Sequence, residues 1–135
     1  MGLVDDEQRF HEEATIKAFI APLRRHRVLE LLANPKRRKT ITSELAHFKW
    51  LDPRFATVIS GSGSASRRIF DLLKSKGAGE TCWLISESPD LDGRKMSLTL
   101  ALDEVIGRDM GTMLSCIPGK LAYFEDEDGR WLLER

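Results

Sequence analysis

The chain lacks any long apolar run, and it has only two cysteines and one tyrosine among 135 residues. Because its longest apolar stretches are a few residues, no segment is long enough to span a bilayer. Residues 1–6 contain no basic start followed by an apolar stretch, so we expect no signal peptide. Myristoylation at Gly2 is disfavoured, since Asp6 stands where a Ser or Thr is required. These absences predict a cytoplasmic protein without a membrane segment.

Cysteine is too scarce for a disulfide framework, and the spacing of Cys82 and Cys116 matches no zinc motif. Both lie in predicted strands, where free cysteine acts as a small buried hydrophobe. Residues 90–93 resemble part of a calcium loop. However, Ser88 and Thr99 fall at the positions where the loop needs an Asp and a bidentate Glu. We therefore predict no metal site and no cofactor.

A legible catalytic motif is also missing. Nucleophilic chemistry would need Cys116 or a serine beside a histidine. The three histidines, His11, His26 and His47, all lie in the N-terminal half, and nothing in their spacing brings one to Cys116. The sequence therefore assigns no residue a catalytic role.

The C-terminal quarter predicts an antiparallel meander. Two apolar runs, 111–117 and 121–125, flank Pro118-Gly119, whose preferred φ angles suit an exposed type II turn. After an acidic turn at 126–129, residues 130–133 return as a third strand. Four apolar side chains should divide between the two faces with period two: Leu114, Ile117, Leu121 and Phe124. A lone hairpin is marginal in water, so helices must cover its apolar face.

The spacing of apolar residues along the chain predicts those helices. Helices are predicted over 5–21, 23–33, 66–76 and 97–106, with another beginning at Asn34-Pro35; strands are predicted over 55–59 and 81–86. At this length we expect one α+β domain covering 1–135. Its helical half, about 5–52, should pack on a small mixed β-sheet within about 55–135.

The loop 60–66 resembles a phosphate cradle in outline, because it joins a predicted strand to a predicted helix. Its candidate ligand-binding residues are Gly61, Gly63, Ser64, Arg67 and Arg68. Neither the Walker spacing nor a full Gly-x-Gly-x-x-Gly is present. A surface loop ending in a serine cap explains the residues equally well. One hypothesis is therefore a small enzyme or binder of phosphorylated or nucleotide ligands.

Charge is balanced overall but unevenly distributed: residues 1–76 carry a net charge of +6 and residues 77–135 carry −6. The basic candidates for partner binding are Arg24, Arg25, Lys36, Arg37, Arg38 and Lys39. They suit an acidic partner if they face solvent, or they pair internally with the acidic loops at 87–92 and 126–128. We expect a mixture, with the run 36–39 exposed.

The basic segment 24–39 also raises the hypothesis of weak nucleic-acid binding. A pI of about 6.8 argues against a dedicated nucleic-acid protein, and no helix-turn-helix, RNA-recognition or zinc pattern is legible. Sequence-specific binding of nucleic acid is therefore not expected.

Two segments resemble small bacterial proteins of an uncharacterised family: Cys-Trp-Leu-Ile-Ser-Glu (82–87) with Leu-Asp-Gly-Arg-Lys-Met (91–96), and Leu-Ser-Cys-Ile-Pro-Gly-Lys-Leu-Ala-Tyr-Phe-Glu (114–125). The resemblance covers the C-terminal half, and Asn-Pro-Lys (34–36) extends it. It implies a bacterial, cytoplasmic, single-domain protein. It transfers no activity and no catalytic residue.

Two classes of function remain open from the sequence. The leading hypothesis is a non-catalytic binding or protein-interaction module whose partner is an unknown protein or an anionic ligand. The second is the enzyme or binder of phosphorylated ligands described above. A homodimer is left open.

Overall fold

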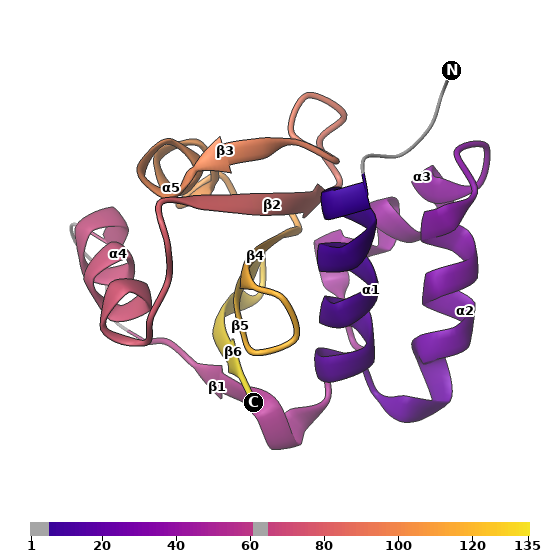
Figure 1. Cartoon of the computed structure of the whole chain (residues 1–135), viewed down its shortest axis with the longest axis horizontal. Coiled ribbons are helices and arrows are strands. Elements are labelled where there is room, and N and C mark those ends of the chain that lie inside the picture. Colours follow the sequence, from indigo (N-terminus) through magenta and orange to yellow (C-terminus); the bar gives the residue numbers. More distant parts are fainter. Residues whose placement is uncertain (1–5, 61–64) are drawn as a thin grey trace.

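An antiparallel sheet of six strands organises the part of the chain that the computed structural model describes, residues 6–60 and 65–135 (Figure 1). The strands are β1 (Ala56–Val58), β2 (Thr81–Ser86), β3 (Lys95–Ser97), β4 (Thr112–Ile117), β5 (Leu121–Asp126) and β6 (Gly129–Glu134). Their order across the sheet is β1-β6-β5-β4-β2-β3, and each neighbouring pair is antiparallel. The predicted α+β class is confirmed, but within the described residues the sheet is antiparallel rather than mixed.

The turn between β4 and β5 has the predicted geometry. Lys120 N donates to Ile117 O over 3.0 Å, and Gly119 has a φ of 71°, as the third residue of a type II turn requires. The turn is less exposed than predicted, because it lies against Ala14 and leaves Pro118 and Gly119 half-buried. The hairpin therefore forms part of the contact with the first helix.

A β-bulge interrupts the expected alternation in β4. The register of β4 on β5 shifts between Ser115 and Ile117. Leu114 and Ile117 consequently pack in the same apolar cluster, together with Leu121, whereas Phe124 lies in the cluster on the other face. The period-two prediction therefore holds for β5 and fails across the bulge, where the extra residue reverses the face.

Two helices cover one face of the sheet: α4 (Ala65–Ser75) and α5 (Leu98–Val105). They bury an entirely apolar set of side chains against the sheet, including Ile69, Leu73, Leu98 and Leu102. Ser97 caps α5, with its Oγ accepting from Leu100 N over 3.2 Å. This layer depends on apolar burial.

The N-terminal helices cover the opposite face: α1 (Asp6–Phe19), α2 (Pro22–Ala33), α3 (Arg38–Thr42) and the 3₁₀ segment η1 (Ser43–His47). Figure 1 shows α1 and α2 side by side, with the sheet between them and α4. Ile16, Phe19 and Val28 of this layer pack with Met113 and Phe124 of the sheet. The described helices include none that is long and apolar enough to cross a membrane.

Several boundaries differ from the predicted ones. Asn34 begins a turn, with its Oδ1 accepting from Lys36 N over 2.9 Å, but the α-helix starts only at Arg38. Strand β3 was not predicted from the sequence. It has three residues, of which only Met96 is buried, so it shows no alternating pattern. A second 3₁₀ turn, η2 (Pro53–Phe55), leads into β1.

A small β-bridge joins the α1–α2 connection to the segment that follows η1. Ile20 pairs with Leu51 in antiparallel fashion. Ala21 N donates to Trp50 O over 2.8 Å, and Asp52 N donates to Phe19 O over 2.7 Å. The bridge holds both ends of the α2–η1 segment at one point.

Candidate functional site

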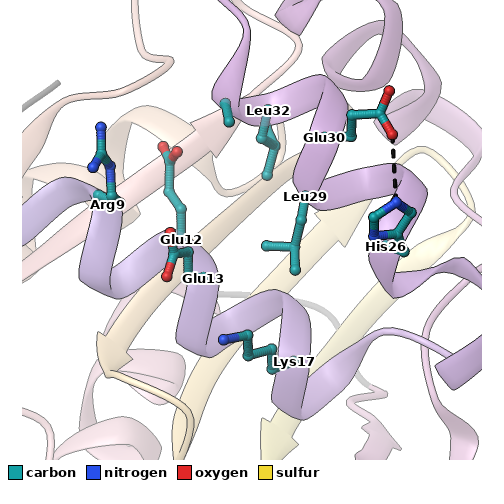
Figure 2. A pocket seen from close by; sticks show the side chains of 9 residues that line it. Arg9, Glu12, Glu13, Lys17, His26, Leu29, Glu30 and Leu32 are labelled. Atoms are coloured by element: carbon teal, nitrogen blue, oxygen red, sulfur yellow. Dashed lines mark ion pairs between the residues drawn. The ribbon is translucent and has the colours of Figure 1, made fainter. Parts of the chain in front are cut away.

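A cavity of about 520 Å³ opens between α1 and α2. It is lined by Arg9, Glu12, Glu13 and Lys17 of α1 and by His26, Leu29, Glu30, Leu32 and Ala33 of α2. We call this cavity the α1–α2 groove. Figure 2 shows its walls: Leu29, Leu32, His26 and Glu30 come from α2, and Arg9, Glu12, Glu13 and Lys17 come from α1.

The floor of the groove is apolar and its rim is charged. Leu29, Leu32 and Ala33 recur at one-turn spacing on α2, so they form a continuous apolar stripe. Leu29 lies only half-buried beside the groove. An apolar floor with a polar rim is typical of a surface that binds another molecule.

A partly buried ionic network anchors the inner wall. Arg38 Nη1 and Nη2 donate to the two carboxylate oxygens of Glu12 over 2.8 and 2.6 Å. Its Nε and Nη2 donate to Asp92 over 2.6 and 3.0 Å. Burial disfavours the charge on Arg38, but the bonds to both carboxylates outweigh it and raise the pKa of Arg38 above its usual value. Arg38 thus ties α1 to the loop after β2.

Arg38 therefore corrects one sequence-based expectation. The run 36–39 was expected to face solvent, yet the side chain of Arg38 is only 15% exposed. Its pairing with Asp92 matches the alternative that basic residues neutralise the 87–92 loop. No feature of the sequence separates Arg38 from its neighbours in the run.

The other predicted partner-binding residues lie at separate places. Arg24 stacks over the Trp50 ring at 5.1 Å, and Arg25 Nε donates to Ile20 O over 2.9 Å. Lys36 and Lys39 are exposed, and Arg37 lies 3.7 Å from a Glu30 oxygen. The basic residues therefore do not form one patch: some bond or pair within the chain, Arg24 stacks on a ring, and Lys36 and Lys39 are exposed.

Ion pairs are unevenly distributed on the rim of the groove. Glu12 is paired with Arg38, and Glu30 lies 3.6 Å from His26 as well as near Arg37. Arg9 and Lys17 form no ion pair with any residue that the structure describes. The two cations on α1 are thus available to an incoming group.

The predicted phosphate loop can be followed only at its two arginines, Arg67 and Arg68. Gly61, Gly63 and Ser64 lie outside the described residues. Arg67 Nε lies 3.3 Å from Asp71, and Arg68 Nη2 donates to the carbonyl of Ser60 over 2.8 Å. A shallow cavity of about 220 Å³ between α4 and α5 includes Arg67 beside the acidic Asp103. The two arginines thus have different partners and do not converge on one anion position.

A serine–histidine pair emerges that the sequence did not reveal. His11 Nδ1 and Ser115 Oγ share a hydrogen bond of 2.7 Å, and Thr15 Oγ1 donates to Ser115 Oγ over 3.1 Å. Burial lowers the pKa of His11. Ser115 is only 2% exposed and lines none of the cavities described above. The pair therefore fastens α1 to β4 rather than presenting a nucleophile.

The acidic turn between β5 and β6 contacts η1 through His47. Its ring nitrogens pair with Glu127 and with Asp128, the latter over 3.2 Å. The hydrogen bond to Asp128 and the charge of Glu127 raise the pKa of His47. Asp126 accepts from the backbone N–H groups of Phe48, Asp128 and Gly129. This cluster joins η1 to the sheet at the surface.

The two cysteines are free and buried, and burial raises the pKa of the Cys116 thiol to about 12. Among the residues that can be placed, no group of three His, Cys, Asp or Glu side chains gathers as metal ligands. The α1–α2 groove is therefore the site that the geometry favours. Comparison of the chain with models of protein families, with curated proteins and with solved structures found no match in any of the three.

Proposed function

We propose that this chain is a non-catalytic protein-interaction module that holds a segment of a partner protein in the α1–α2 groove. The observation that carries the proposal is the groove itself: an apolar floor about one helical turn long, formed by residues 29–33 and open to solvent between charged rims. Exposed apolar surface of this kind is costly in water unless a partner covers it.

Exposed apolar side chains on the outer faces of the same helices support the proposal. Phe10 is 64% exposed and Leu23 is 96% exposed. By helical spacing, Phe10 lies one turn from Glu13 on α1, and Leu23 lies one turn from His26 on α2. Partner contacts can thus extend from the groove onto both helices. The bacterial family resemblance supports a cytoplasmic setting, in which the buried thiols stay reduced.

A selection followed by NMR mapping tests the proposal. Peptides enriched from a displayed library of random helical sequences should shift the NMR signals of Leu29, Leu32 and Ala33. Ala33→Trp should abolish binding, since the indole fills the groove from an exposed position. Glu104→Trp, at an exposed position on α5, is the matched control and should bind normally. Enrichment equal on both variants, or shifts centred on α4 and α5, would refute the proposal.

A further inference from the structure

The charges on the groove's rim narrow the chemistry of the occupant. Residues 6–42, which span α1 to α3, carry nine Lys and Arg against five Asp and Glu. The carboxylates of Glu12 and Glu30 already have partners within the chain. Arg9 and Lys17 have no ion-pair partner among the described residues. Glu13 also has no ion-pair partner among the described residues, so the unmatched charge at the rim is two cations against one carboxylate.

The walls also favour one conformation of the occupant. The groove runs between two helices, whose backbone N–H and C=O groups are bonded within each helix. An extended peptide would find no sheet edge there, so its backbone groups would lose water without gaining partners. A helix bonds its own backbone groups and presents only side chains. The groove therefore suits a helix.

The spacing of the two cations sets the pattern that such a helix needs. Arg9 and Lys17 are eight residues apart on α1, about 12 Å along its axis. On a partner helix, residues seven or eight apart share a face and span about 10.5 to 12 Å. Glu13 stands between the two cations on the same wall. An acidic residue at the middle of the partner's stripe would therefore be repelled, which adds specificity.

We infer that the partner segment is an acidic amphipathic helix, with an apolar stripe on the Leu29–Leu32 floor and two carboxylates that pair with Arg9 and Lys17. This inference rests on the proposed function and names the partner chemistry of that same groove. The apolar stripe supplies most of the affinity, because exposed ion pairs contribute little. The carboxylates select orientation and partner.

Two labelled peptides of about 15 residues test the inference by fluorescence anisotropy. Both carry the same leucine stripe; one has Glu at the two positions seven residues apart and the other has Lys there. The acidic peptide should bind about tenfold more tightly at low salt, with a smaller difference at physiological salt. The double variant Arg9→Glu, Lys17→Glu should reverse the preference. A matched pair of charge reversals on the other layer, Arg67→Glu with Lys74→Glu, should leave it unchanged.

The outcomes separate this inference from the proposed function. Equal binding of both peptides, abolished in both by Ala33→Trp, would overturn the acidic partner and keep the groove as a docking site. Binding of neither peptide, or binding that Ala33→Trp does not alter, would overturn both. Sedimentation of the free protein as a dimer that Ala33→Trp converts to a monomer would assign the groove to a second copy and overturn the inference. A short RNA that binds at physiological salt and displaces the acidic peptide would also overturn it.

Discussion

The two helical layers are attached to the sheet by different means. The buried side chains of α4 and α5 are all apolar. The layer of α1 to α3 adds directed polar contacts, from Arg38 to Glu12 and Asp92 and from His11 to Ser115. Apolar burial is non-directional, whereas a bidentate ion pair fixes position. The comparison shows how α1 can be held firmly while a groove stays open beside it.

The largest expected effect comes from breaking the ionic tie. Arg38→Met keeps much of the side-chain volume but leaves the Glu12 and Asp92 carboxylates without their cation. The free energy of unfolding should fall by about 3 kcal/mol in urea denaturation, since removing one partner strands a buried charge. Arg37→Met, at an exposed position in the same run, should change it by less than about 0.5 kcal/mol. Equal losses in the two variants would show that charge does not hold this layer.

A close backbone contact gives the next effect. A Cβ at Gly111 would overlap the backbone carbonyl of Leu45, where η1 meets the start of β4. Gly111→Ala should therefore cost about 2 kcal/mol, because η1 must move away from the sheet. The control is Gly79→Ala, where nothing lies within 4 Å of the new atom. Thermal or urea denaturation distinguishes the two, and a neutral Gly111→Ala would contradict the close packing of η1.

The hairpin turn that lies against α1 should be less sensitive. Gly119→Val introduces a β-branched side chain at a φ of 71°. We expect a loss of about 1 kcal/mol from backbone strain. Gly79→Val, at a position without a positive φ, should cost less when measured in the same urea series. If both variants unfold at the same urea concentration, the turn does not depend on glycine at 119.

The smallest effect is a pH dependence that should differ in sign between two histidines. The pKa of His11 is lowered by burial, so its contribution is present above about 6.5 and is lost as the pH falls below that value. The pKa of His47 is raised by Asp128 and Glu127, so its contribution is present below about 6.5 and is lost as the pH rises. Unfolding from pH 5 to 8, with His11→Gln and His47→Gln, should show opposite changes in slope. If both substitutions change the slope of unfolding free energy against pH in the same direction, the opposite pKa shifts assigned to the two histidines are contradicted.

Local patterns predicted most of the elements because their causes are local. Pro22 opens a helix, Ser97 caps one, and the Pro118-Gly119 turn folds the hairpin as its φ preferences require. Strand β2 was predicted with its observed ends. Strand β3 was missed, since three residues with a single buried side chain carry no period.

The candidate site depended on contacts between distant residues, which no pattern in one sequence encodes. His11 and Ser115 are far apart in the chain, and Arg38 is chemically like the exposed cations beside it. The groove lies where α1 and α2 run beside each other, and the Glu12–Arg38 pair joins α1 to α3 at its inner wall. The floor of the groove could have been predicted from the sequence only through an apolar stripe on α2 that included Leu29.

The bridge between Ile20 and Leu51 makes residues 20–51 a closed loop anchored beside the sheet. Loop-closure entropy grows only with the logarithm of length, so doubling such a loop costs about 0.6 kcal/mol. The turn at 34–37 is exposed, and added residues there would change neither the bridge nor the strand register. The exposed turn between α2 and α3 is thus the point where this layer can change in length while the bridge and the sheet keep their register.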